Sequence, residues 1–167
     1  MVGNGRVGKT SLTHRVVFDQ FEEQAARTKV VNSYSKAVHI ENTQKWAQVQ
    51  IWDTLGQDRF KSVAPAYFRR AVGAFLVYDI SNMESFRALE EWYEQIQNSQ
   101  EKVIIMLLGN KLDVANREVP YNEAMEYAMK NNFGFMEVSA KMGIGAKEAL
   151  GRMVAGKVIY FVITSKI

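Results

Sequence analysis

Short apolar runs alternate along this chain with segments of helical periodicity. The apolar runs lie at residues 37–40, 47–52, 74–80, 104–108 and 135–139, and each predicts a strand. Two of them, 74–80 and 104–108, consist almost entirely of apolar residues, as expected for interior parallel strands that are buried on both faces. Strands separated by helix-length segments predict an α/β fold with a largely parallel sheet and helices on both faces.

Three segments have the apolar spacing of helices. The first covers 86–96, with Ser81 or Asn82 as its candidate N-cap, and the second covers 120–129, with a proline at its start. The third, 150–162, has a helical apolar stripe, although residues 158–164 have the β-branched and aromatic content of a strand. Two glycines within it weaken a helix by roughly 1 kcal/mol each relative to alanine. We nevertheless predict a helix there.

The first strand is shorter than its place in the pattern requires. Only Met1 and Val2 precede the first glycine motif, although such a motif normally follows a whole strand. That strand should be central, and its loss would leave unpaired backbone groups inside the sheet. We therefore expect it to begin before Met1. With it, the prediction is a mostly parallel six-stranded sheet with one antiparallel strand, in one domain over residues 1–167.

Composition narrows the possible functions. The net charge is only +3, and the basic residues are scattered among acidic ones, so nothing indicates nucleic-acid binding. The chain has no cysteine, which excludes disulfides, thiolate metal sites and a cysteine nucleophile. It contains neither a signal peptide nor an apolar run long enough for a membrane span, so we expect neither export nor a transmembrane segment.

The strongest motif is a glycine-rich loop that fits the pattern G-x-x-x-x-G-K-[ST]. Its residues are Gly3, Asn4, Gly5, Arg6, Val7, Gly8, Lys9 and Thr10, followed by Ser11. Glycines let backbone N–H groups converge on phosphate oxygens, the next helix presents its positive end, and Lys9 adds a charge. Thr10 can place its hydroxyl on Mg²⁺. The alternative is a turn that only caps a helix. The motif indicates a nucleoside triphosphate but does not select the base.

A second polar group selects the base. Asn110, Lys111 and Asp113 stand at the C-terminal end of the most apolar strand, on the ligand side of an open α/β sheet. The Asp113 carboxylate can accept from both the N1–H and the N2 amine of guanine, whereas adenine offers no such pair of donors. The alternative is an ordinary polar turn. A further polar group just past the next strand supplies a second wall for the base: Ser139, Ala140 and Lys141.

A third motif follows the strand at 47–52. Asp53 can hold Mg²⁺ through water, and the N–H of Gly56 can sense a γ-phosphate. Gln57 can orient an attacking water, while Lys9 neutralises charge on the phosphates, so these two are the candidate catalytic residues. The alternative is a turn with an Asx cap.

Three such motifs in this order, each after a strand, resemble the small GTPases of the Ras superfamily over nearly the whole chain. Residues 51–60, Tyr67 and 76–80 are similar to the Rab branch in particular. The resemblance implies a P-loop NTPase G domain that binds GDP or GTP with Mg²⁺ and hydrolyses GTP slowly as a switch in vesicle and membrane trafficking. It also implies an exchange factor, a GTPase-activating protein and effectors as partners.

The resemblance further implies a cytoplasmic protein that associates peripherally with trafficking membranes. Because the chain has no cysteine for prenylation, we expect membrane attachment only through a C-terminal anchor that this chain as given does not hold.

The resemblance also places the first switch and a partner surface. Counting from Lys9 as in the family gives Phe21 as the residue that stacks on guanine and Thr28 as the one that binds Mg²⁺. Counting back from Trp52 gives Val30 instead, so we prefer Thr28 and place two additional residues in the hairpin at 41–45.

In Rabs an aromatic trio faces partners. Trp52 and Tyr67 match two members, and Tyr34 is the candidate third. For Trp52 we favour packing in the core over a contact role.

Some residues depart from the family pattern. Leu55 replaces a small residue before Gly56, Arg6 stands where a small residue is usual, and Lys29 and Val30 replace the usual Ile-Gly. These departures keep open a second hypothesis, a module that binds guanine nucleotide with little or no hydrolysis and acts as a scaffold or decoy. An ATP-using P-loop enzyme is a third, and the group at 110–113 argues against it.

Overall fold

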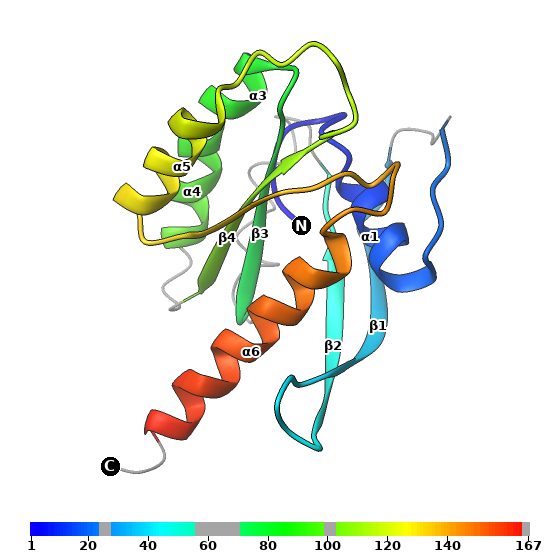
Figure 1. The fold of residues 1–167 in the computed structure, drawn as a ribbon, viewed down its shortest axis with the longest axis vertical. Coiled ribbons are helices and arrows are strands. Elements are labelled where there is room, and N and C mark those ends of the chain that lie inside the picture. The colour runs from blue at the N-terminus through cyan, green and yellow to red at the C-terminus, as the bar shows by residue number, and fades with distance from the viewer. Residues whose placement is uncertain (24–27, 56–70, 99–102, 165–167) are drawn as a thin grey trace.

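A computed structural model describes residues 1–23, 28–55, 71–98 and 103–164, with side chains up to residue 156. The described residues form five helices and five strands (Figure 1). In chain order they are α1 (Lys9–Phe18), β1 (Asn32–His39), β2 (Trp46–Asp53), β3 (Gly73–Asp79), α3 (Met83–Arg87), α4 (Leu89–Gln97), β4 (Ile104–Asn110), α5 (Tyr121–Lys130), β5 (Gly134–Glu137) and α6 (Ala146–Thr164).

The strands form one parallel sheet and one antiparallel pair. β3, β4 and β5 are parallel and adjacent in that order, whereas β1 and β2 pair antiparallel from Asn32↔Asp53 to His39↔Trp46. Val2 joins the parallel sheet beside β3, through hydrogen bonds of 2.8 Å to Phe75 and Val77. The nitrogen of Met1 donates to the Trp52 carbonyl oxygen over 2.9 Å, so the first two residues lie between the two sheets. The predicted α/β fold is confirmed.

Successive residues of β3 point to opposite faces of the parallel sheet. Helices cover both of these faces. Leu76 and Tyr78 face a core formed with α3, α4 and α5, in which Trp92 is 1% exposed. Phe75 and Val77 face a second core formed with α1 and α6. Figure 1 shows the same division, with α3, α4 and α5 on one side of the sheet and α1 and α6 on the other.

Several element boundaries differ from those predicted. The helix expected at 86–96 is interrupted at Ala88, and its cap is Asn82, whose side chain accepts from the Ser85 N–H over 2.9 Å. β1 begins earlier than the run at 37–40, because backbone pairing with β2 extends it through polar residues that carry no apolar signal. The last element is helical, as predicted, despite glycines at 151 and 156.

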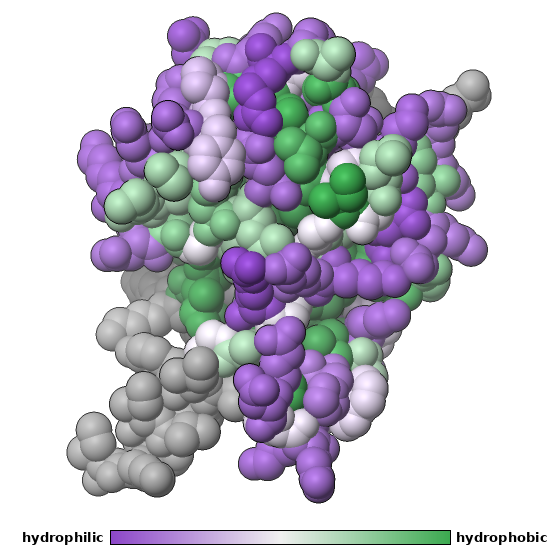
Figure 2. Space-filling view, viewed as in Figure 1, coloured by the Kyte–Doolittle hydropathy of each residue, from purple (hydrophilic) through white to green (hydrophobic). Residues whose placement is uncertain are grey.

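The surface is mostly polar on the face seen in Figure 2, with apolar side chains in smaller groups between the polar ones. The large apolar side chains most exposed among the described residues are Val30, Trp46 and Met129, each about two-thirds exposed at 67%, 67% and 69%. None of the helices that the structure describes is both long and apolar enough to cross a membrane.

Burial of the Leu107 side chain, at the centre of β4, should contribute strongly to the free energy of unfolding. Leu107 is fully buried between β3 and β5, so Leu107→Ala should lower the free energy of unfolding by about 2–5 kcal/mol through lost burial and a residual cavity. Met129→Ala, at an exposed site on α5, is the matched truncation and should change it by less than about 0.5 kcal/mol. Urea unfolding of both variants measures the difference, and equal losses would contradict this core assignment.

Candidate functional site

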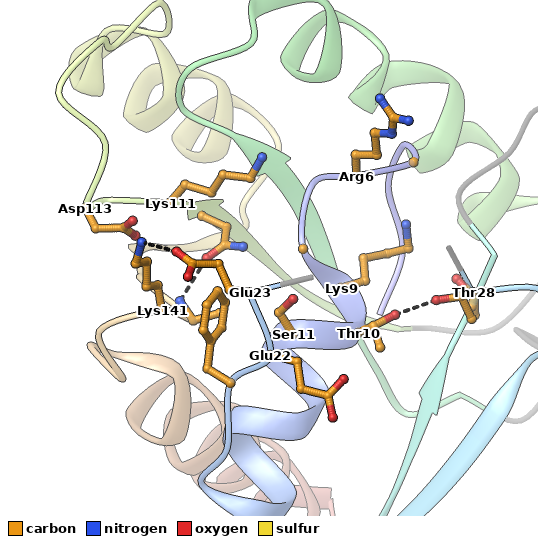
Figure 3. Close-up of a pocket in the computed structure, with 16 residues that line it drawn as sticks. Arg6, Lys9, Thr10, Ser11, Glu22, Glu23, Thr28, Lys111, Asp113 and Lys141 are labelled. Atoms are coloured by element: carbon orange, nitrogen blue, oxygen red, sulfur yellow. Dashed lines mark hydrogen bonds and ion pairs between the residues drawn. The ribbon is translucent and has the colours of Figure 1, made fainter. Parts of the chain in front are cut away.

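A pocket opens at the carboxyl ends of the central strands, where α/β folds place their ligands. Its volume is about 520 Å³, within the range of small-molecule sites. The residues predicted from the sequence that line it are Gly5, Arg6, Gly8, Lys9, Thr10, Ser11, Phe21, Thr28, Asn110, Lys111, Asp113, Ala140 and Lys141. Figure 3 shows Lys9 and Thr10 toward one end of the pocket and Asp113 and Lys141 toward the other.

Two glycines in the loop before α1 pack so closely against the rest of the fold that no side chain would fit. Gly3 has φ +139°, and a Cβ there would lie 2.1 Å from the Val77 carbonyl oxygen. Gly8 has φ +94°, and its Cβ would lie 2.2 Å from the Asn110 side-chain nitrogen. Only glycine fits either position, because both the conformation and the space exclude a side chain. The loop can therefore turn directly from the sheet into the N-terminus of α1, where free N–H groups attract anions.

Lys9 holds a positive charge at this end of the pocket. Its ammonium donates to the carbonyl oxygens of Gly3 over 2.8 Å and Asn4 over 2.7 Å, and the residue is only 6% exposed. Burial lowers the pKa of Lys9 to about 8, while the Asp53 carboxylate opposes that shift. A cation held in so little water is attracted to any phosphate that enters the pocket.

Three oxygen-bearing side chains meet beside α1. The Thr10 hydroxyl lies 2.6 Å from that of Thr28 and donates to Asp53 Oδ2 over 2.7 Å. The other oxygen of Asp53, Oδ1, is buried and has no hydrogen-bond partner among the described residues. Burial raises the pKa of Asp53, with the Thr10 hydrogen bond opposing. An unsatisfied carboxylate oxygen and two hydroxyls form a donor set that fits a hard cation such as Mg²⁺.

The opposite end of the pocket is organised by Asn110. Its side-chain nitrogen donates to the Val7 carbonyl oxygen over 2.8 Å, and its Oδ1 accepts from the Ala140 N–H over 3.2 Å. One buried amide thus ties the glycine loop at 3–8 to the loop at 139–142. Asp113 accepts from the Ser139 hydroxyl over 2.5 Å, which orients its carboxylate at the pocket wall.

Lys111 has φ +70°, and its ammonium pairs with Asp79 over 2.5 Å. This ion pair links the start of the loop after β4 to the end of β3, and Lys111 itself lines the pocket. The polar end of β3 is therefore held against the loop that follows β4.

Three pocket residues escaped prediction from the sequence. Glu22, Glu23 and Thr54 line the pocket, and Glu23 pairs with Lys141 over 2.8 Å (Figure 3). The Glu23 carboxylate raises the pKa of Lys141. Their proximity in sequence to Phe21 and Asp53 was the available signal, but an acidic pair after the predicted guanine-stacking residue gave no reason to include them.

Other predicted residues lie behind the pocket wall or outside the described residues. Asn4 turns its side chain away and accepts from the Trp92 indole N–H over 2.7 Å, while Val7 and Ser139 are buried behind the wall. Arg6 lines the pocket at φ +67°. Gly56, Gln57 and Tyr67 fall in the part of the chain that the structure does not describe.

The β1–β2 hairpin separates the other two residues of the expected aromatic trio. Tyr34 pairs with buried Ile51, and its ring contacts His14 and Phe18 of α1 with centroids 5.8 and 5.6 Å apart. Trp52 is the next residue along β2, so its side chain points to the opposite face, where it is 41% exposed. Tyr34 and Trp52 therefore do not share one surface, and the expected core packing of Trp52 is wrong.

Comparison with known proteins shows similarity to one family profile and to several Ras-related proteins. The sequence profile described as the Ras family matches residues 1–158. Ras-related protein RABA4d of Arabidopsis thaliana is 38% identical over 99% of this chain and 74% of its own length. Ras-related protein Rab-4A of Danio rerio is 39% identical over 89% of this chain and 70% of its own, and Ras-related protein Rab-11C of Dictyostelium discoideum is 36% identical over 99% and 73%.

The Asn110 amide should be essential to the pocket. Asn110→Ala leaves the Val7 carbonyl and the Ala140 N–H buried without a partner, so the free energy of unfolding should fall by about 2 kcal/mol or more. Asn32→Ala removes an exposed amide that also bonds a backbone carbonyl, and it should change stability by less than about 0.5 kcal/mol. Chemical denaturation measures both, and an Asn110→Ala loss as small as the control's would refute the tie.

Proposed function

This chain belongs to the Ras family and is Rab-like, and we propose that it acts as a slow GTPase switch in vesicle and membrane trafficking. Members of the family bind guanine nucleotides with Mg²⁺ and hydrolyse GTP. The observation that carries the proposal is one pocket of about 520 Å³ with a buried lysine and a helix N-terminus at one end and an oriented carboxylate at the other. That arrangement fits a nucleotide with a guanine base.

We assign the phosphates to the α1 end of the pocket. The N–H groups of the loop at 3–8 and the ammonium of Lys9 bind and neutralise them. Thr10 and Asp53 are the residues that would hold Mg²⁺, joined by Thr28 in the GTP state. When bound, the ion supplies charge neutralisation for the phosphate oxygens. The Asp53 carboxylate, buried and half-unsatisfied, is thereby given a counter-charge.

We assign the base to the opposite end. Asp113 accepts from the guanine N1–H and N2 amine, since Ser139 already holds its carboxylate in place. Phe21 provides one face for the ring, and the loop that carries Ala140 and Lys141 provides the facing wall. Glu23 and Lys141 form an ion pair, and both line the pocket.

Hydrolysis rests on positioning, because phosphoryl transfer leaves little covalent work to the protein. Gln57 orients the attacking water and Gly56 contacts the γ-phosphate, although both lie outside the described residues. Lys9 stabilises the charge of the transferring group. Leu55, in place of a small residue, is buried at 8% exposure, and its bulk beside Gly56 keeps a second function in view, a nucleotide-binding module with little hydrolysis.

The exposed face of the hairpin is the surface we assign to partners. Trp52 stands on it, whereas Tyr34 stabilises the hairpin against α1. An exchange factor, a GTPase-activating protein and effectors are the partners expected of a switch. We place this G domain in the cytoplasm, in peripheral association with trafficking membranes.

Nucleotide choice tests the base assignment. GDP and GTP should bind far more tightly than ADP and ATP, and Asp113→Asn should weaken GDP binding by about 1–3 kcal/mol, because an amide N–H then faces the donors of the base. Glu84→Gln, an exposed acid on α3, should leave affinity unchanged. The measurement is displacement of a fluorescent guanine nucleotide. Equal competition by ATP would refute the assignment.

The dependence of nucleotide binding on Mg²⁺ tests whether Thr10, Thr28 and Asp53 hold the ion. Chelating Mg²⁺ should speed nucleotide release, because the phosphates lose a counter-charge. Thr28→Ala should weaken GTP binding more than GDP binding, whereas Thr10→Ala should weaken both. Release rates of fluorescent GDP and a GTP analogue measure this with and without chelator. Equal losses for the two nucleotides in Thr28→Ala would assign the Mg²⁺ contact to another residue.

The rate of GTP hydrolysis distinguishes the proposed switch from a nucleotide-binding module with little hydrolysis. The isolated protein should release phosphate from bound GTP on the order of 10⁻⁴ s⁻¹, as Ras does alone, and a partner that supplies an arginine should raise that rate by roughly 10³–10⁵. Gln57→Leu should lower the intrinsic rate while nucleotide affinity stays nearly unchanged. The measurement is single-turnover phosphate release at saturating Mg²⁺.

Turnover near one per second without a partner is inconsistent with this mechanism. No detectable turnover, alone or with a Rab-type activating protein, would establish the binding module instead.

A further inference from the structure

One arginine outside the pocket contacts the loop that reads the base. Arg15 lies in α1, and its side chain is 16% exposed. Its Nε donates to the Ala140 carbonyl oxygen over 2.9 Å and its Nη2 to the Lys141 carbonyl oxygen over 3.1 Å. Its Nη1 donates to the backbone oxygen of Asp19 over 2.8 Å and to Oδ1 of the same residue over 3.2 Å. Arg15 does not line the pocket.

These bonds fix the orientation of two peptide planes. In a trans peptide the carbonyl and the following N–H point in opposite directions, so a carbonyl held by Arg15 turns the next N–H away from it. The plane whose carbonyl is that of Lys141 carries the N–H of Met142, which donates to Ser139 Oγ over 3.0 Å. Arg15 thus sets the position of a hydrogen bond that Ser139 accepts.

The orientation of Ser139 is passed on to the carboxylate that faces the base. Because Ser139 Oγ accepts from Met142, its own proton is directed to Asp113 Oδ1, 2.5 Å away. The guanidinium is held in turn: Asp19 ends α1 and also pairs with Lys147 of α6 over 2.8 Å. Arg15 is therefore fixed at the start of a hydrogen-bonded path that ends on Asp113.

We propose that Arg15 is a positioning residue for guanine specificity, acting on Asp113 through Lys141, Met142 and Ser139. The inference rests on the proposed function, in which Asp113 reads guanine. A planar guanidinium suits this role, since two of its nitrogens hold adjacent carbonyls at once, whereas a lysine ammonium is a single point donor. A comparison of two nucleotides that carry the same phosphates separates this path from the phosphate contacts.

The experiment compares GDP with inosine diphosphate, which lacks the N2 amine that Asp113 accepts. Competition against a fluorescent guanine nucleotide gives, for each protein, the Kd of inosine diphosphate divided by the Kd of GDP. Arg15→Met keeps the aliphatic stem and should lower the ratio roughly threefold to tenfold toward that of Asp113→Asn, as for loss of alignment in a hydrogen bond to a charged group. Arg152→Met, which removes an exposed pair with Glu148 on α6, is the matched control and should keep the wild-type ratio.

Each outcome decides the proposal. The proposal is supported if the ratio falls in Arg15→Met and keeps its wild-type value in Arg152→Met. A parallel loss of GDP and inosine diphosphate affinity, or no loss, overturns it, because a merely structural arginine changes both alike. If Arg15→Met does not unfold cooperatively on heating, Arg15→Lys decides, with an intermediate ratio expected and a wild-type ratio contradicting the role of the two-carbonyl contact. A wild-type protein that does not distinguish GDP from inosine diphosphate or ADP refutes the proposed function itself.

Discussion

The buried amide of Asn110 joins the two halves of the pocket. It donates to the glycine loop at Val7 and accepts from the loop at 139–142 at Ala140, so neither loop is positioned independently of the other. Gly8 is required for the same reason, because a side chain there would occupy the space of that amide. One side chain at the end of β4 therefore contacts both loops that border the pocket.

Lys9 and Asp53 are buried beside this pocket, and burial disfavours the charged form of each. Burial lowers the pKa of Lys9 and raises that of Asp53, which are the directions expected when water is removed from a cation and from an acid. The fold bears this cost at the N-terminus of α1 and at the end of β2. A ligand that brings phosphate and a divalent cation compensates both charges, so binding and stability are linked through the same two residues.

The sequence predicted most where structure is local. The predicted α/β fold is confirmed. The group at 110–113 and the loop at 139–141 follow strands of the parallel sheet, the glycine loop follows Val2, which bridges to β3, and all three lie around one pocket. Tyr34 was misplaced because the side of a hairpin to which a residue points depends on its register with β2, which spacing does not give. Arg15 and Glu23 were missed because their contacts join segments more than a hundred residues apart.

The two apolar faces of β3 have a consequence for folding. A shift of this strand by one residue exchanges Leu76 and Tyr78 with Phe75 and Val77, and both sets are apolar, so hydrophobic burial barely distinguishes the two alignments. The correct alignment is marked by contacts at specific positions: Tyr78 lies over Gly109, where no side chain would fit, and Asp79 reaches Lys111. Those markers border the pocket. A nucleotide that binds there stabilises only the correctly aligned chain, so it would shift the equilibrium between the two alignments toward the native one.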